Sequence, residues 1–471
     1  MAYNRQEVLD THKDYKENVT NWEYYIRSYN GGYDYMVGQY LNRYNLELDN
    51  EFNQRLANTP CDNHCKNIVQ IYSSFLFRSK PSRNFGAMQD EVTLERFLKD
   101  ADLDGNNFNT VIKQAQNYAS IYGHVFLILD KPPIRTNTKA EEIEEDIRPY
   151  VSIITPENVL DWNFKRMLNG KYVLDYLKVR EEVDRKGGTY MRLWYTDRVE
   201  TVYVEDQTSD PVVIDTVDNQ IGKIPAVILY NAKSHKRGIG QSDLVDVADL
   251  QRSIYNEFSE IEQLIRLTNH PSLVKTAGVN ASAGAGAVIE MPDEMDSNLK
   301  PYLLQPSGQN LNAIMDSIAK KVESINRIAH TGAVRTTKTQ VSSGIALQTE
   351  FELLNARLSE KADNLELAEE QLFKLYAEYQ NTTFDGEINY PDSFNIRDYA
   401  SDLIFYQQAK SINVPSSTLN KEIDKEIAKA VVDDEMLLNQ IYNEIEASSE
   451  VGQFTQNEVQ EAEEAVQQEQ I

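Results

Sequence analysis

The feature that most constrains the fold is a set of three long runs without glycine or proline. They span Gln241–His270, Asn310–Thr331 and Ile345–Asp385, and in each run apolar residues recur three or four positions apart. That spacing places the apolar residues on one side of an α-helix, so each run predicts a long helix with a narrow apolar stripe. Such stripes have to be buried against other helices, and a ring of identical subunits supplies more of these than one small domain.

Between Gly123 and about residue 230 the pattern changes to that of β-strands. Short stretches rich in Val, Ile, Tyr and Thr alternate or run apolar, and turn sequences such as Asn169-Gly170 and Gly187-Gly188 separate them. This pattern predicts a mainly antiparallel β region inserted among helices. The expected fold class is therefore α+β and mainly helical, in a chain of 471 residues that is long enough for several domains.

Composition excludes some classes of protein. The longest apolar runs, Val125–Leu129 and Ala226–Tyr230, are far shorter than the roughly 20 residues of a membrane span. The N-terminus carries no apolar segment of a secretory signal, so we expect a cytosolic protein. The net charge of −27 argues against tight binding of nucleic acid. It does not exclude a surface past which DNA slides without being held.

No pattern in the chain predicts an active site. The phosphate-binding, zinc-protease and serine-hydrolase motifs are all missing. Cys61, His64 and Cys65 lie close together, but without further ligands we interpret the cysteines as ordinary residues of one helix face. Asp243 stands in an aspartate series that we interpret as a capped first helical turn, with a metal site as the alternative. We therefore predict no catalytic residue, no metal, no cofactor and no enzyme activity.

The first 45 residues hold nine tyrosines, and a Gly31-Gly32 break separates two expected helices there. Tyrosine rings can cover a core with their apolar bodies while their hydroxyl groups stay polar. The alternative is a contact surface for another subunit or for a shell protein, because tyrosine is enriched at protein interfaces. The sequence favours the first interpretation and leaves the second open.

Three stretches together resemble the portal proteins of tailed bacteriophages, over roughly Asn63 to Gln380. They are NHCKNIVQIYSSFLFRSKP at Asn63–Pro81, the longer stretch at Ile221–Gln263, and VSSGIALQTEFELLNARLSEKA at Val341–Ala362. The second is the most specific, since IGKIPAVILYN precedes GIGQSDL at the start of a long helix. The order and spacing of the three stretches carry the resemblance.

The resemblance implies a portal fold with named segments. These would be a wing at 1–240 with the β region at about 123–230, a first stem helix at 241–270, a clip at 271–309, a second stem helix at 310–330, a tunnel loop at 331–343, a long wing helix with its connection at 344–400, a crown at 401–450, and an acidic Gln/Glu-rich tail at 451–471 that we expect to be disordered. The tail and the tyrosine-rich start match no part of the family pattern.

The resemblance also implies roles for particular residues. DNA-facing residues of the tunnel loop would be Thr331, Gly332, Arg335, Thr336, Thr337, Lys338 and Gln340. Candidates for the channel face of the stem are Lys320, Lys321 and Arg327, whose simpler interpretation is a solvated helix charge. Clip residues that would contact the terminase or an adaptor are Lys275, Asn280, Ser282, Glu290, Asp293 and Glu294.

The implied function is that of a dodecameric ring at one capsid vertex, through which double-stranded DNA is packaged and ejected. Implied partners are DNA without sequence preference, the large terminase subunit, a head–tail adaptor, and the major capsid and scaffolding proteins, with no membrane. The protein would be part of the virion and of the host cytoplasm during assembly. Two alternatives remain: another ring-forming virion adaptor or scaffold protein, and an enzyme that uses the β region.

Overall fold

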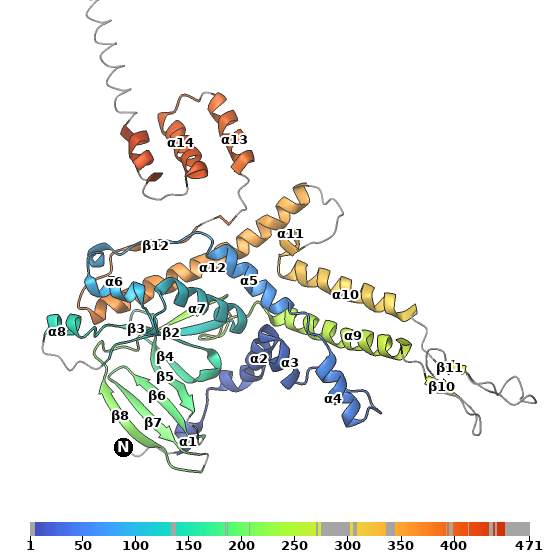
Figure 1. Cartoon of the computed structure of the whole chain (residues 1–471). Coiled ribbons are helices and arrows are strands. Elements are labelled where there is room, and N and C mark those ends of the chain that lie inside the picture. Colours follow the sequence, from blue (N-terminus) through green and yellow to red (C-terminus); the bar gives the residue numbers. More distant parts are fainter. Residues whose placement is uncertain are drawn as a thin grey trace, which may run out of the picture. The chain divides into compact units, whose positions relative to one another are not determined.

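The computed structural model divides the chain into two compact units, Met1–Phe394 and Asn395–Ile471 (Figure 1). It describes residues 5–132, 138–183, 185, 187–206, 208–269, 272–274, 302–304, 309–335, 344–391, 393–394, 399–412, 414–432, 437–438 and 440–447. The fold is a mixture of helices and antiparallel sheets, so the predicted α+β class is confirmed.

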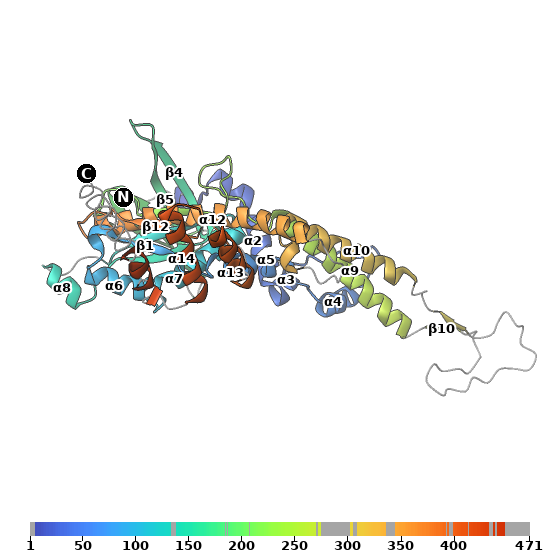
Figure 2. The ribbon, with the colours of Figure 1, turned by 90° about the horizontal axis from the view of Figure 1, so that it is seen from above.

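The three glycine- and proline-free runs form the three longest helices, α9 (Val245–Asn269), α10 (Gln309–Ile328) and α12 (Gly344–Tyr379). Helices α9 and α10 lie side by side, and the chain runs out along α9 and back along α10 (Figures 1 and 2). Their apolar stripes face each other, since Ile261, Ile318 and Ile325 are buried in one hydrophobic core. Helix α9 begins four residues later than predicted, because residues 241–244 form a separate loop.

The centre of the first unit is a three-stranded antiparallel sheet. Strand β2 (His124–Asp130) lies between β3 (Tyr150–Ile154) and β9 (Ala226–Tyr230). Residues 124–129 of β2 are all buried, because helix α7 (Phe108–Tyr122) and helix α12 pack against this sheet. A strand covered in this way is apolar at successive positions instead of alternating apolar and polar residues, and the run HVFLILD has this pattern.

The rest of the β region is a five-stranded antiparallel meander. Its strands follow the sequence order β4 (Val159–Arg166), β5 (Tyr172–Val183), β6 (Thr189–Tyr195), β7 (Arg198–Val204) and β8 (Val212–Asp218). Strand β4 was not among the predicted strands, although Leu160, Trp162 and Phe164 alternate with polar residues as in a half-buried strand. In the structure Leu160 and Trp162 of β4 are buried.

Shorter elements surround these sheets and long helices. They are α1 (Arg5–Leu9), α2 (Lys13–Asn30), α3 (Gly32–Val37), α4 (Asp49–Asn58), α5 (His64–Leu76), α6 (Val92–Lys99), α8 (Lys139–Glu144), α11 (Gly332–Arg335) and the paired strands β1 (Ser82–Asn84) with β12 (Glu387–Asn389) and β10 (Ser272–Val274) with β11 (Tyr302–Leu304). The second unit contains α13 (Tyr399–Ser411) and α14 (Ser417–Val431), which contact each other.

The N-terminal tyrosines mainly close the core, as the sequence favoured. Tyr35 is fully buried, the Tyr24 hydroxyl donates to the Ala248 carbonyl at 2.8 Å, and the Tyr15 hydroxyl donates to the Glu157 carbonyl at 3.0 Å. Tyr33, with 74% of its surface exposed, is an exception.

The cysteines do not share a helix face as expected. Cys61 precedes α5, whereas Cys65 lies in the first turn of that helix, and both are free thiols. Burial raises the pKa of the Cys61 thiol to about 11 and raises that of Cys65 further. Within the described ranges, no group of three or more His, Cys, Asp or Glu side chains could hold a metal ion. None of the described helices is long and apolar enough to span a membrane.

We predict that His124 makes the fold sensitive to acid. Burial lowers the pKa of this imidazole to about 3, below its ordinary value near 6.5. Between these two pH values only the unfolded chain takes up the proton, so stability is complete above pH 6.5 and falls as the pH decreases toward 3. The free energy of unfolding of the wild type, measured with urea, should be lower at pH 5 than at pH 7. His124→Asn should make this difference smaller by about 2 kcal/mol.

The matched control is His235→Asn, because His235 is exposed. That variant should follow the wild-type dependence on pH. An unchanged pH dependence in His124→Asn would contradict the assignment.

Candidate functional site

Helices α9 and α10 were predicted as the stem, and the structure separates the three stem cations into two kinds. The Lys321 ammonium lies 2.6 Å from the Glu257 carboxylate of α9, which also accepts a hydrogen bond from the Ser317 hydroxyl at 2.7 Å. Lys321 therefore joins the two helices and is not available as an exposed channel cation.

Lys320 and Arg327 lie on the other side of α10, and both are exposed. They are seven residues apart, which places them on one helix face. Glu323 lies between them on that face, and Asp316 lies about one turn before Lys320. Both carboxylates are exposed. Within the described part of the chain neither cation forms an ion pair. The face of α10 that points away from α9 is thus hydrated and carries charges of both signs.

The segment predicted as a tunnel loop begins with ordered structure. Gly332–Arg335 forms the short helix α11, and the Thr331 side chain is completely buried. An Arg335 guanidinium nitrogen lies 2.6 Å from Nδ1 of His64, at the start of α5, and burial lowers the pKa of Arg335. In this conformation both side chains are used in packing, and the assignment of Thr331 and Arg335 to a DNA-facing loop stays a prediction.

The other tunnel-loop residue within the described ranges is Gly332, which packs near the Glu350 carboxylate of α12. The remaining predicted residues of the tunnel loop and clip lie outside the described residues. They are Thr336, Thr337, Lys338, Gln340, Lys275, Asn280, Ser282, Glu290, Asp293 and Glu294.

Among the described residues, the most strongly buried ion pair lies just before α9 begins. The Lys361 ammonium of α12 contacts the Asp243 carboxylate at 2.6 Å, and the side chains are 0% and 3% exposed. Arg357, one turn earlier on α12, contacts the other Asp243 oxygen at 2.9 Å. Asn231, directly after β9, donates to that oxygen at 3.0 Å and accepts a hydrogen bond from Lys361. We call Asp243, Asn231, Arg357 and Lys361 the buried junction.

The interpretation of Asp243 as part of a capped first turn is therefore wrong. Burial by itself would raise the pKa of Asp243, but the charges of Lys361 and Arg357 outweigh burial and hold that pKa below its usual value. Burial lowers the pKa of Lys361, and the Asp243 charge opposes this change. The geometry is that of an ion pair whose hydrogen-bonding groups are satisfied away from water.

Close backbone packing positions the loop that carries Asp243. Gly123 has a φ of +94°, and a Cβ atom there would lie 2.6 Å from the Gly240 carbonyl oxygen. A side chain at Gly240 would meet the Gly123 carbonyl even more closely. The Asp243 amide donates to the Ser120 carbonyl at 3.0 Å and the Gln241 amide donates to the Ala232 carbonyl at 2.8 Å. The two glycines thus let the loop lie directly on the end of α7.

A tyrosine extends the contacts of the buried junction to the end of α10. The Tyr72 hydroxyl of α5 donates to the Ala329 carbonyl at 2.5 Å, just after α10 ends. The Lys361 ammonium lies 5.1 Å from the centre of the Tyr72 ring, within the range of a cation–π contact. The start of α9 and the end of α10, where this helix pair meets the rest of the first unit, are therefore both held against α12.

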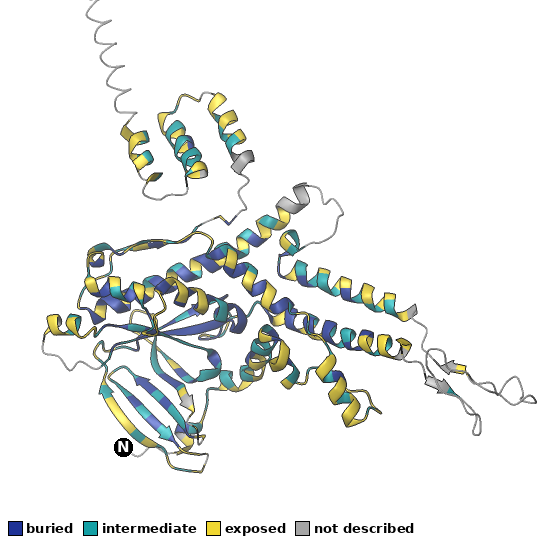
Figure 3. Cartoon of the chain, viewed as in Figure 1, coloured by how far each residue is buried: buried dark blue, intermediate teal, exposed yellow. Residues whose placement is uncertain are grey.

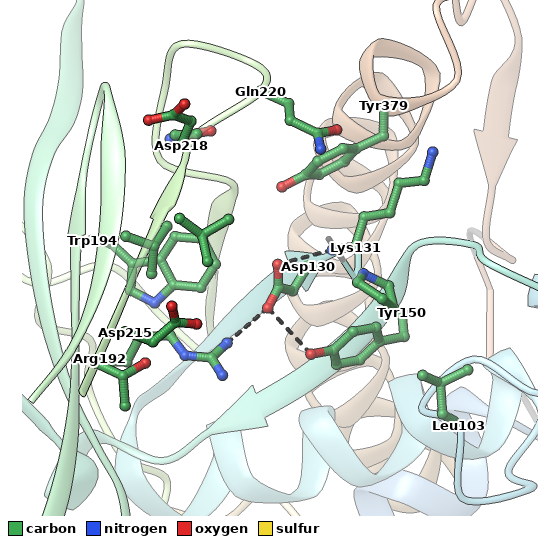
Figure 4. A pocket seen from close by; sticks show the side chains of 15 residues that line it. Leu103, Asp130, Lys131, Tyr150, Arg192, Trp194, Asp215, Asp218, Gln220 and Tyr379 are labelled. Atoms are coloured by element: carbon green, nitrogen blue, oxygen red, sulfur yellow. Dashed lines mark hydrogen bonds and ion pairs between the residues drawn. The ribbon is translucent and has the colours of Figure 1, made fainter. Parts of the chain in front are cut away.

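A cavity lies between the two sheets and the end of α12 (Figure 4). Its volume is about 330 Å³, and Trp194, Tyr150 and Tyr379 form part of its wall. At its centre the Asp130 carboxylate accepts hydrogen bonds from Arg192 at 2.7 Å and Tyr150 at 3.2 Å.

An enzyme that used the β region would be expected to have its active site in this cavity. The described lining of the cavity contains no His, Cys or Ser. Asp130 is engaged by a cation and a hydroxyl group, and Arg192 is held by both Asp130 and Glu181. The carboxylate is therefore in a poor position to act as a general base.

Comparison with known proteins gives one clear family match. The model of the family described as "Phage portal protein, SPP1 Gp6-like" matches residues 6–413. No curated protein matches the chain.

Two solved structures are similar at low identity. A chain from the virion of a native gene transfer agent particle is 9% identical, with a TM-score of 0.42, and the match covers 76% of this chain and 89% of that one. A chain from the neck of an empty gene transfer agent particle is 10% identical, with a TM-score of 0.41 and coverage of 80% and 89%.

We predict that the buried junction is essential for stability. Lys361→Met leaves Asp243 buried with only one of its two cations, which should lower the free energy of unfolding by about 3–5 kcal/mol. Adding Asp243→Asn should recover part of this loss, because the uncompensated charge is removed. Urea unfolding of the single and double variants measures both effects.

Lys374→Met is the matched control, since Lys374 is on the same helix but its side chain is 53% exposed in a surface pair with Glu370. It should cost less than about 0.5 kcal/mol. Equal losses for Lys361→Met and Lys374→Met would show that burial of the pair does not matter.

Proposed function

This chain belongs to the family of phage portal proteins, SPP1 Gp6-like, and on that premise we propose that it forms the DNA channel at one vertex of a phage capsid. Proteins of this family are structural and not enzymes, so the prediction that the chain is not an enzyme is confirmed. The observation that carries the proposal is the family match, which extends over the sheets and all three long helices.

The α9–α10 pair would form the stem of the channel. Its two helices bury their apolar stripes in one hydrophobic core, while α10 presents a hydrated face of alternating charge. We propose that this face lines the channel, with Lys320 and Arg327 as the cations nearest to DNA. A face on which carboxylates offset the two cations suits a moving duplex, since each stable phosphate contact adds to affinity and would hold the DNA.

We propose the remaining assignments by membership of the family. The ring would be a dodecamer, with residues 271–309 as the clip that contacts the large terminase subunit and later a head–tail adaptor. Residues 331–343 would form the tunnel segment, with Lys338 in place of Arg335 as its DNA-facing cation. Residues 401–450 would form the crown, and the major capsid and scaffolding proteins would surround the ring.

We predict that the purified chain assembles into a closed ring. Native mass measurement should give a species of about a dozen copies of the 54.0 kDa chain, and electron microscopy should show a central hole. A stable monomer at micromolar concentration would contradict the proposal.

We predict that Lys320→Gln combined with Arg327→Gln leaves the ring intact and weakens the retention of packaged DNA. The two substitutions remove cations from the proposed channel face without touching the α9–α10 contact. The measurement is native mass of the ring together with the DNA content of assembled particles.

The matched control combines Lys99→Gln with Lys374→Gln, which removes two exposed cations from other helices. This control should retain DNA as the wild type does. Loss of the ring in the Lys320/Arg327 double variant would show that these residues contact a neighbouring subunit instead of the channel.

A further inference from the structure

The cavity between the two sheets has one wall on the five-stranded sheet. Arg192 and Trp194 lie two positions apart on β6, so their side chains point to the same face of the sheet. Thr201 of β7 is the register partner of Arg192 on one side and of Asp215 of β8 on the other. All four side chains line the cavity. This wall therefore carries an indole ring, a cation and a carboxylate.

A buried hydroxyl group on the opposite wall lacks a hydrogen-bond partner. Tyr379, the last residue of α12, is 9% exposed, and its side chain points into the space in front of Trp194 (Figure 4). Within the ranges that the structure describes, no group of the protein forms a hydrogen bond with this hydroxyl. Burial and the nearby charge of Asp130 raise the pKa of Tyr379, so the hydroxyl keeps its proton at neutral pH. An unpaired buried polar group is unfavourable, and this one indicates a molecule bound in the cavity.

The lining of the cavity is acidic. Asp130 is paired with Arg192 at 2.7 Å, and Arg192 also contacts Glu181 at 2.9 Å, so its one positive charge is shared by two carboxylates. Asp215 and Asp218 are exposed residues of β8, a strand that is exposed along much of its length (Figure 3). In the described part of the chain neither of them forms an ion pair. The cavity thus has carboxylates both at a half-buried inner end and at its exposed rim.

The Asp130 carboxylate at the inner end has room for one more hydrogen-bond donor. A carboxylate has about four acceptor positions, and three are used here, by Arg192, Tyr150 and the Lys131 backbone amide. The Lys131 ammonium does not take the fourth position, because it is engaged in an ion pair of its own. The Tyr379 hydroxyl lies on the same side of the cavity (Figure 4), so an ammonium group can donate to both.

Aromatic rings beside carboxylates are the chemistry that binds an organic cation, since the ring faces attract the cation and the carboxylates neutralise it. Carboxylates at both the inner end and the rim indicate a ligand with two positive ends. We propose that the cavity binds a linear aliphatic diamine. One ammonium group donates to Asp130 and the Tyr379 hydroxyl, the other lies at the rim beside Asp215, and the aliphatic chain contacts the Trp194 ring. The volume of about 330 Å³ is at the lower end of the range of ligand sites and suits a molecule of this size.

Other classes of ligand fit the cavity less well. An anion would meet the three carboxylates of the lining and only one cation that is not paired with a residue outside it. A single ammonium group, such as the end of a lysine side chain of another protein, would leave either the inner end or the rim without a counterion. The site lies in the β region, so its existence does not depend on the proposed channel.

Calorimetric titration of the purified full chain with putrescine, at physiological ionic strength, tests the proposal. We expect one bound putrescine per chain and an at least tenfold lower affinity for butylamine, because butylamine has only one ammonium group. Equal affinities for the two amines would show that the site recognises a single cation, as a lysine side chain of a partner would supply. That result, or no binding of putrescine, would overturn the proposal.

Two substitutions examine the two ends of the cavity. Tyr379→Phe removes a hydroxyl that the protein does not use, so the ligand-free chain should keep its melting temperature while putrescine binds about tenfold more weakly. Asp215→Asn removes a charge at the rim and should weaken binding by a similar factor. The matched control is Asp210→Asn, because Asp210 is also exposed but does not line the cavity. This control should bind putrescine as the wild type does.

The variants also show how the proposal fails. An equal loss of affinity in Asp210→Asn would mean that the overall negative charge of the chain holds putrescine, and unchanged affinity in Tyr379→Phe would mean that no ligand reaches the inner end. A further measurement needs no variant. Putrescine should raise the melting temperature of the wild type more than butylamine does at the same concentration, since the tighter ligand stabilises the folded state more. Equal shifts would contradict the two-ended site.

Discussion

The arrangement of the first unit depends on the ion pair between Asp243 and Lys361. The two residues are 118 positions apart, and neither carboxylate nor ammonium is accessible to water. Removing a charge pair from water costs several kcal/mol per ion, and only good geometry with full hydrogen bonding offsets that cost. Arg357 and Asn231 complete this geometry, so the start of α9, the end of β9 and the middle of α12 have to come together as a unit.

This junction has a mechanical consequence for the α9–α10 pair. The α9–α10 pair extends away from the sheets, and both of its inner ends contact the region around α12, through Asp243 at one end and through Tyr72 and Ala329 at the other. A displacement of the pair is therefore transmitted to α12 through charged and hydrogen-bonded contacts, which are directional. Apolar stripes alone would allow the helices to slide, because dispersion contacts have little directional preference.

The cations of the chain are of two kinds, buried structural ones and exposed ones. Cations with a structural task are buried and paired, as Arg55 and Lys361 are, while Lys320 and Arg327 remain exposed on one face of α10. The sequence could not separate these two kinds, since a lysine on a helix is exposed in most proteins and nothing local marks the exception. For this reason Arg335 was predicted to face DNA from the tunnel loop, although its guanidinium contacts His64.

The sequence by itself determined the three long helices, most of the strands and the mixed class, because periodicity at 3.6 or two residues is a local property of the chain. It also contained the order of motifs that identifies the portal family. Only the tertiary structure decided what the stripes pack against, that Asp243 is a buried ion instead of a helix cap, and that Arg55 holds the loop before α4 against α9. Each of these is a contact between residues far apart in sequence, and a stripe predicts that a face is buried without specifying its partner.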